Sequence, residues 1–439
     1  MLNKLKSYYE YNKEQIEYVI SKLDIAILIL YGLFVFEAFL RSTTFEINWH
    51  PYYHMSLKVI LILLAFGKSL LKFIDNIPLY MLLGFCSVGF LLAYLQGNHG
   101  ILLELILFTI AFVDIDYKNL ITIFTAILSL SLLIIVTGSQ VGILNNLVYT
   151  TYEGVTRISF GVHYPTNFAS YILFLCLAWG FNRKQKISYI ELFIMFTFAY
   201  TIHHFCAART SSLCLTTFSC ILFLYKITQN NSVKKLFSHL FYKILLYPIV
   251  FAVVLSSIIS IGLSYAWTPN NNFLFKINQM ISGRLLLSKE IFNNYDIKLL
   301  GQHIEMRGNG GYSLFWVYNE SMDNPNYNFI DSSYLSILFR YGLFVFICVI
   351  ALFTLTSFVA RKHHDYITLI IIAIIAVHSI MEHHLLDFNY NPFMFLLISS
   401  YYGKHNSKNK LNKSDITTSK KLLQDDLDVI TTSNKEVQA

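Results

Sequence analysis

Charged residues are scarce in this sequence: they make up 13% of its 439 residues, whereas hydrophobic residues make up 55%. A soluble domain of average composition carries about 25% charged residues, so this composition argues against a soluble protein. The mean hydropathy of +0.52 agrees with that conclusion. No alternating strand pattern competes with the long apolar runs. Lipid is therefore the expected surrounding of most of the chain.

Sequence features of several other protein classes are missing. The six cysteines form no CxxC pair and lie within or beside apolar segments, which favours small core residues over a disulfide framework. The chain has no phosphate-cradling glycine loop and no Walker motif, so a nucleotide substrate is not supported. Met1–Lys22 is polar where a cleaved signal peptide would have an apolar core, and we expect the first span to be retained.

The basic residues follow the pattern of a membrane protein and not that of a nucleic-acid-binding protein. The formal net charge is +7, but the lysines and arginines lie mainly in short connections and in the tail. With the N terminus inside, the cytoplasmic segments hold Lys4, Lys6, Lys13, Lys22, Arg183, Lys184, Lys186, Lys226, Lys234, Lys235, Lys243, Arg361 and Lys362. Because short cytoplasmic loops are expected to be basic, we predict that both termini are cytoplasmic.

The apolar runs predict an all-α polytopic membrane protein with about twelve transmembrane helices, within a range of about ten to thirteen. The expected spans are Asp24–Arg41, Met55–Phe73, Pro78–Gln96, His99–Val113, Asn119–Val136, Pro165–Phe181, Ile187–Cys206, Ser211–Tyr225, Ile244–Ser264, Ser333–Val359, Ile367–Met381 and Asn391–Tyr402. The transmembrane domain therefore covers 24–402, after a cytoplasmic segment 1–23. The polar tail 403–439 is predicted to be cytoplasmic and disordered.

One connection is too polar to lie in lipid. Residues 265–332, between the ninth and tenth expected spans, form a predicted extracytoplasmic loop. Its first half, Phe273–Tyr295, has apolar residues at helical spacing, which predicts one amphipathic helix on the membrane or on the bundle. Its second half is rich in glycine and predicts irregular structure that could fold over a site.

Short motifs follow one another through this loop into the next span. They are Ser282-Gly283-Arg284, Leu299-Leu300-Gly301, Ile330-Asp331-Ser332-Ser333-Tyr334-Leu335 and Leu338-Phe339-Arg340-Tyr341-Gly342-Leu343. In order and spacing they resemble the Wzy-type O-antigen and capsule polymerases, which commonly show an SGR-like helix, an LLG.G turn and an IDN.YL segment before a YG-containing span. This chain differs in having His303 in place of the second turn glycine and Ser332 in place of the asparagine.

Two upstream segments extend the resemblance. Residues 157–167, which begin with Arg157, are similar to the family's arginine-rich stretch with its G..xPN element, although Thr166 separates the proline from the asparagine. Ala208-Arg209-Thr210-Ser211 is similar to the family's SRT turn. The predicted topology places Arg157, Arg209 and Arg284 at the outer face.

The resemblance implies a GT-C-like membrane glycosyltransferase. Such an enzyme polymerises undecaprenyl-diphosphate-linked oligosaccharide repeat units into O-antigen, capsular polysaccharide or exopolysaccharide at the outer face of a bacterial cell membrane. It also implies an inverting, metal-independent reaction without a cofactor. The implied partners are the lipid-linked oligosaccharide and membrane lipids, and a chain-length regulator is compatible with them.

Two alternatives stay open. One is a ligase that attaches finished polymer to a surface acceptor; the related ligases place a histidine where this chain has Asp331. The other is a flippase for lipid-linked sugar or polysaccharide. Flippases usually distribute charged residues through several spans and lack one dominant external loop, so the loop 265–332 argues against this class.

Arginine side chains suit a diphosphate donor. A guanidinium binds phosphate oxygens bidentately and stays charged at any relevant pH. Negative charge grows on the diphosphate as the glycosidic oxygen departs, so fixed cations stabilise the transition state more than the ground state. The predicted substrate-binding residues are Arg284, Arg209, Arg157, Tyr334 and Arg340. The alternative for the first three is anchoring to lipid phosphates, and the alternative for the last two is packing.

The attacking sugar hydroxyl needs a proton acceptor. Asp331 is the first candidate catalytic residue, and His303 and Glu305 follow it. Asp331 could alternatively be only the cap of the helix that begins there. The sequence from His378 to His384 contains metal-ligand side chains but lacks a further well-spaced ligand set, so we predict no metal and favour hydrogen bonding or acceptor contact.

Overall fold

The computed structural model describes residues 11–45, 51–150, 155–228, 246–281, 283–307 and 328–399. They form a helical bundle with one small antiparallel hairpin. Within these described ranges, six helices are long and apolar enough to cross a membrane, and they cover Lys13–Arg41, Tyr52–Lys72, Ile77–Gly97, Tyr117–Gln140, Arg209–Ile227 and Ser333–Lys362. The shorter apolar helices include Gly100–Ala111, Ala252–Ala266 and Tyr366–His378. The chain is thus an all-α, multi-pass membrane protein.

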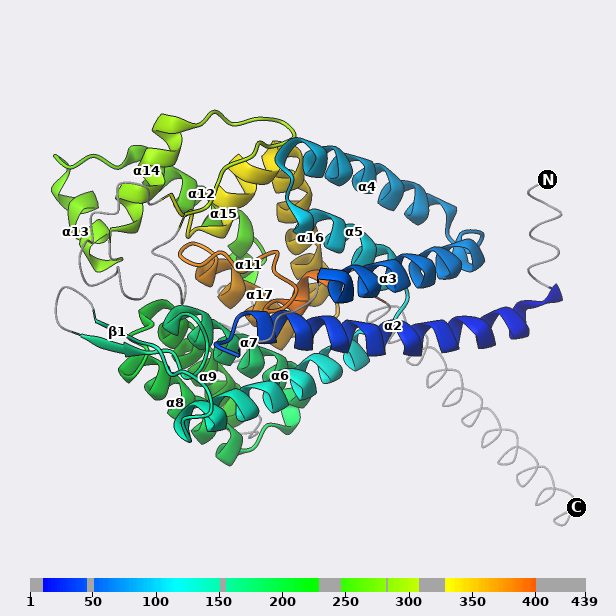
Figure 1. Cartoon of the computed structure of the whole chain (residues 1–439), viewed down its shortest axis with the longest axis horizontal. Coiled ribbons are helices and arrows are strands. Elements are labelled where there is room, and N and C mark those ends of the chain that lie inside the picture. The colour runs from blue at the N-terminus through cyan, green and yellow to red at the C-terminus, as the bar shows by residue number, and fades with distance from the viewer. Residues whose placement is uncertain are drawn as a thin grey trace, which may run out of the picture.

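The elements are shown in chain order in Figure 1. They are α2 (Lys13–Arg41), α3 (Pro51–Lys72), α4 (Ile77–Gly97), α5 (Gly100–Ala111), α6 (Tyr117–Gln140), β1 (Val148–Thr150), β2 (Thr156–Ile158), α7 (Pro165–Arg183), η1 (Lys184–Lys186), α8 (Tyr189–His204), α9 (Arg209–Thr228), α11 (Leu246–Ile249), α12 (Ala252–Ala266), α13 (Asn272–Met280), α14 (Arg284–Asn294), α15 (Ser333–Ser336), η4 (Ile337–Tyr341), α16 (Gly342–Lys362), α17 (Tyr366–His378) and η5 (Pro392–Phe395). The π-helical segment η4 joins α15 to α16.

Polar side chains cap several helix starts. Asp116 accepts a hydrogen bond from the backbone of Lys118 at the start of α6, and Asp365 accepts one from Thr368 at the start of α17. Ser188 and Glu191 form a complete capping box at α8. These bonds satisfy backbone N–H groups that have no partner within the helix, which matters most where the surroundings are apolar.

The helix α17 lies at the centre of the bundle and is buried over nearly its whole length. It packs against α7, α9, α12 and α16, and Figure 1 shows it surrounded by other helices. Figure 1 also places α13, α14 and β1 at one end of the molecule and the start of α2 at the other. Because α17 is central, the segment that follows it begins inside the bundle and is surrounded by other helices.

Helices cover the first eleven expected spans, with shifted boundaries. The helix α2 begins at Lys13, so part of the expected N-terminal segment is helical. The expected twelfth span is wrong over its described part: residues 392–395 form only a short 3-10 helix, followed by turns up to Ser399. Phe393 and Phe395 are buried against aromatic rings of α5, α6 and α7, so the apolar run fills the core. An apolar run of this length suits a buried segment as well as a span.

The expected single helix Phe273–Tyr295 is two helices. The chain turns at Gly283, whose φ is +81°. The side chain of Asn278 accepts hydrogen bonds from the backbone N–H groups of Leu285 and Leu286, at 3.0 and 3.1 Å. These bonds start α14 in a new direction, and periodicity alone does not reveal such a break. Residue 282, the stretch 308–327 and the tail lie outside the described residues.

Candidate functional site

Arg284, the first residue of α14, places its guanidinium between two carboxylates. Its Nε lies 3.3 Å from Oδ2 of Asp331, and its Nη1 lies 3.1 Å from Oε1 of Glu382. The same Nη1 donates to the carbonyl oxygen of Met381. Asp331 precedes α15, and Glu382 follows α17. Three segments that are far apart in the sequence therefore meet at one cation.

The two carboxylates differ in exposure. The Glu382 side chain is 6% exposed, whereas those of Arg284 and Asp331 are 22% and 20% exposed. A buried carboxylate depends strongly on its charge partner. Burial raises the pKa of Asp331 to about 6; Arg284 opposes this rise and Glu382 adds to it. Asp331 can therefore exchange a proton near neutral pH, which suits an acid or base in a reaction.

Ser333 fixes the two carboxylate-bearing segments relative to each other. Its hydroxyl donates to the carbonyl oxygen of Glu382 at 2.6 Å and accepts from the backbone N–H of Leu385 at 3.1 Å. Its own N–H donates to the carbonyl oxygen of Ser379 at 3.0 Å. These bonds hold the start of α15 against the segment after α17, so the position of Asp331 beside Arg284 is defined by backbone contacts.

Two interpretations of neighbouring residues need correction. The N-cap position of α15 is Ser332 and not Asp331, and the Asp331 carboxylate lies at Arg284. Tyr334, a predicted substrate-binding residue, is fully buried, and its hydroxyl donates to the carbonyl oxygen of Ala376 at 2.9 Å. Its position is explained by packing and hydrogen bonding within the core.

Arg157 and Arg209 are held differently from Arg284. The Nε of Arg157 donates to the carbonyl oxygen of Cys206 at 2.9 Å, which ties the hairpin to the turn between α8 and α9. Arg209 begins α9 with an exposed side chain. Ser211, in the first turn of α9, lies 3.1 Å from Nε2 of His378 at the end of α17. Contacts thus connect the segments of Arg284 and Arg209 to the end of α17, and the Arg157 hairpin to the turn before α9.

His303 lies with a different group of residues. Its Nδ1 is 3.1 Å from the carbonyl oxygen of Gly97, and its ring stacks on His99 at 6.2 Å. It is therefore placed against the turn between α4 and α5 and not beside Asp331. Glu305, the other alternative proton acceptor, is exposed and forms an ion pair with Arg307 at 2.6 Å.

Arg340 lies on a cavity of about 210 Å³ next to the Asp331 site. Its Nη1 is 3.4 Å from the hydroxyl of Ser336 and its Nη2 is 3.4 Å from Nδ1 of His99. The cavity is lined by Ile101, Met306, Phe329, Ser333, Ser336, Ile337, Arg340, Tyr341, His383, Leu386 and Asp387. Burial raises the pKa of Asp387 to about 6. A cationic group, a carboxyl group and aromatic rings therefore share one small space.

The two glycine motifs of the sequence pack against each other. The backbone N–H of Gln302 donates to the carbonyl oxygen of Arg340 at 3.0 Å, and the N–H of Phe344 donates to that of Leu299 at 3.0 Å. Gly301 and Gly342 both have a positive φ, of +78° and +94°. A Cβ on either residue would overlap the backbone of the other motif. Only glycine fits at this crossing.

Gly301→Ala is accordingly expected to lower the stability of the protein by on the order of 2–4 kcal/mol, because it adds both steric overlap and backbone strain. Gly84→Ala is the matched control, since a Cβ at Gly84 meets no atom within 4 Å. Thermal unfolding of both variants in detergent checks this expectation. Equal melting temperatures for the two variants would show that the crossing is not tightly packed.

Comparison with known proteins assigns no family to this geometry. No family model, no curated protein and no solved structure matches the chain. The resemblance to Wzy-type polymerases therefore stays a prediction that depends on the motif residues alone.

Sequence reasoning missed the role of Glu382 as the partner of Arg284. The stretch from His378 to His384 was expected to form hydrogen bonds or acceptor contacts, but Arg284 was not predicted as the partner of Glu382, which is 98 positions away. Among the described residues, Glu382, His383 and His384 form a group whose ligand atoms lie within 4.8 Å of one another. Arg284 would compete with any divalent cation for the Glu382 carboxylate, because both require its negative charge. The absence of a metal stays a prediction.

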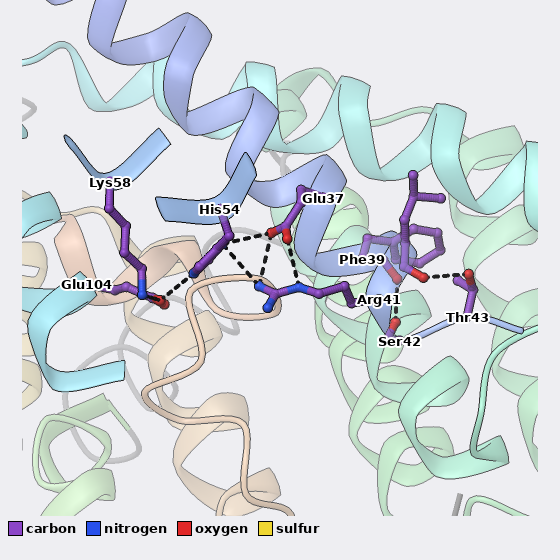
Figure 2. Close-up of polar contacts among 9 residues, drawn as sticks. Glu37, Phe39, Arg41, Ser42, Thr43, His54, Lys58 and Glu104 are labelled. Atoms are coloured by element: carbon purple, nitrogen blue, oxygen red, sulfur yellow. Dashed lines mark hydrogen bonds and ion pairs between the residues drawn. The ribbon is translucent and has the colours of Figure 1, made fainter. Parts of the chain in front are cut away.

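A second charged cluster, also missed, joins α2, α3 and α5 (Figure 2). Glu37, which is 1% exposed, pairs with Arg41 at 2.9 Å and with His54 at 3.2 Å. Glu104 pairs with His54 at 3.1 Å and with Lys58 at 2.7 Å. The i, i+4 spacing of Glu37 and Arg41 was a signal available in the sequence. The cluster places cationic or hydrogen-bonding side chains beside the negative charges of two carboxylates, and it connects three helices.

Proposed function

We propose that this protein is a membrane glycosyltransferase that polymerises undecaprenyl-diphosphate-linked oligosaccharide repeat units at the outer face of a bacterial cell membrane. The observation that supports this most is the position of Arg284 between Asp331 and Glu382. A cation that can bind phosphate and a carboxyl group that can take a proton are the two groups that the reaction requires.

The proposed donor contact follows from the charges at the site. In the free protein, one guanidinium faces two carboxylates, so little positive charge is left for a ligand. A diphosphate can attract the Nε edge of Arg284 away from Asp331, while Nη1 stays bonded to Glu382. Asp331 is then free to face the acceptor sugar. Exposed Arg209 could add a second cation at the same end of the bundle.

The proposed chemical step is a single displacement. The hydroxyl oxygen of the acceptor sugar attacks the anomeric carbon, and the bond from that carbon to the diphosphate oxygen breaks. The hydroxyl proton passes to Asp331, and undecaprenyl diphosphate leaves with its growing charge stabilised by Arg284. One displacement inverts the configuration at the anomeric carbon, as in other inverting sugar-transfer reactions.

The cavity beside Arg340 suits the acceptor. Its volume of about 210 Å³ is on the scale of one sugar ring, and it combines Tyr341 and Phe329 with Arg340 and Asp387. Aromatic rings with a few polar groups are a common way to hold and orient a small ligand. Ser333 lines this cavity and also fixes Asp331, so an acceptor here would be next to the proposed base.

The direct test is a reaction of purified protein with lipid-linked repeat units. A ladder of longer lipid-linked chains together with released undecaprenyl diphosphate supports the polymerase. Transfer onto a different acceptor would favour a ligase. A flippase is the second candidate, because charged residues on α2, α3 and α5 are a feature of translocation routes (Figure 2). Movement of the lipid across a vesicle without chain lengthening would favour it.

The proposed topology has the N terminus in the cytoplasm and the loop 265–332 outside. It is supported by basic residues at the turns between α7 and α8 and between α16 and α17. In a cysteine-free background, Asn294→Cys is expected to react with an impermeant thiol reagent in intact cells, whereas Gln185→Cys is expected to react only after lysis. The opposite pattern would place the proposed active site in the cytoplasm and contradict the function.

A further inference from the structure

Another cavity lies at the opposite end of α17 from the Arg284 site. It has a volume of about 530 Å³ and opens to the surroundings. The turns before α6, between α7 and α8, and between α16 and α17 meet there, beside the end of α9. Its lining is Asp116, Lys118, Phe181, Asn182, Arg183, Lys184, Gln185, Lys186, Tyr225, His364, Asp365, Tyr366 and Ile367.

Positive charge dominates this lining. It contains the four cations Lys118, Arg183, Lys184 and Lys186 against the two acids Asp116 and Asp365. Lys184 forms an ion pair with Asp365 at 2.6 Å, Arg183 forms one with Glu191 at 2.6 Å, and Asp116 caps the start of α6, which leaves Lys118 and Lys186 as the other exposed cations of the lining. Burial lowers the pKa of Lys184, Asp365 opposes that change, and Lys118 adds to it by repulsion. Like charges are therefore held close together around one space.

The backbone at the cavity is strained in two places. Lys184 has φ of +43° and His364 has φ of +55°. Neither residue is glycine, and such conformations persist where the surrounding structure requires them, often at ligand sites. Both residues line the cavity from different turns. His364 is further held by its Nδ1, which lies 2.9 Å from the hydroxyl of Tyr366.

We propose that this cavity binds a phosphate group, carried either by an anionic phospholipid of the adjoining leaflet or by a soluble phosphate compound. Lysine and arginine side chains supply the charge and the donors that phosphate oxygens require. The rings of Phe181, Tyr225 and Tyr366 form an apolar wall on which the rest of such a molecule can lie. Basic pockets between transmembrane helices are a recognised setting for phospholipid headgroups. This site is independent of the proposed polymerase activity.

The test compares the full-length protein with the double variant Lys118→Gln/Lys186→Gln. Both lysines are exposed, so the fold should be kept, and gel filtration checks this. The control Lys22→Gln/Lys362→Gln removes the same charge from exposed positions outside the cavity. One arm counts cardiolipin and phosphatidylglycerol retained in native mass spectrometry, with phosphatidylcholine for comparison. The other arm measures the rise in melting temperature with inorganic phosphate.

If the retention of anionic lipid falls at least threefold in the cavity variant and not in the control, the result supports a lipid headgroup as the ligand of the cavity. Stabilisation by phosphate that disappears only in the cavity variant, without selective lipid retention, supports a soluble phosphate ligand. If the cavity variant and the control behave alike in both arms, the proposal is wrong.

Discussion

Arg284→Ala is expected to abolish polymer formation while lipid-linked single repeat units remain. The substitution removes the guanidinium that would stabilise the departing diphosphate, a contact whose loss costs on the order of 3–4 kcal/mol in comparable oxyanion sites. Arg284→Lys should recover little, because an ammonium group cannot bond two oxygens in a fixed fork. Product ladders from purified protein and lipid-linked repeat units provide the measurement.

The same substitution also has a structural effect that must be separated from the chemical one. Without Arg284, Glu382 would be a buried carboxylate without its charge partner, which costs about 3–5 kcal/mol in other proteins. The double variant Arg284→Ala/Glu382→Gln removes this penalty and still lacks the cation. It should be stable and inactive. Arg307→Ala, in an exposed ion pair of the same loop, is the control and should polymerise normally. Activity in the stable double variant would contradict the proposed role of Arg284.

Asp331→Asn is expected to slow polymerisation about a hundred-fold or more, in line with the loss of a general base elsewhere. The amide keeps the size of the side chain but cannot take the proton. Because burial raises the pKa of Asp331 to about 6, the wild-type rate should rise as the pH passes through about 6 and then level off. The Asn variant should lack this rise. Rates of both proteins measured from about pH 5 to about pH 8 provide the comparison.

The stability of the Asn variant distinguishes catalysis from structure. The pKa of Asp331 is raised above its usual 3.8, so the folded state binds this proton more tightly than the unfolded state does. The contribution of Asp331 to stability is therefore greatest below its usual pKa and is lost as the pH rises towards about 6. Asn, which stays neutral, should not destabilise the protein at neutral pH. A slow variant with an unchanged melting temperature fits a catalytic role.

Asp296→Asn, at an exposed position in the same loop, is the control and should keep its activity. EDTA in the same reactions tests metal independence, because Glu382, His383 and His384 offer ligand atoms close to one another. Near-normal turnover of Asp331→Asn would shift the role of proton acceptor to Asp387, which lies in the neighbouring cavity, or to the departing diphosphate itself.

The sequence alone determined the class of the fold and most of its helices. A span must be long enough to cross the bilayer and must satisfy its backbone hydrogen bonds internally, so run length and hydrophobicity predict helices directly. The first eleven expected spans therefore match α2 to α9, α11 to α12 and α15 to α17, with shifted ends. Arg284 and Asp331 were selected for a different reason, which is the resemblance of their motifs to Wzy-type polymerases together with the need for a phosphate-binding cation and a proton acceptor.

The tertiary structure decided which of these residues meet. Arg284 pairs with Asp331 and with Glu382, and nothing in the local pattern of any of the three predicts the other two. The same holds for His303, which contacts Gly97 across 206 positions, and for the apolar run after Asn391, which fills the core. Short-range periodicity records only which face of a segment is apolar. Contacts between distant segments depend on how the helices pack, and packing is determined by the whole chain at once.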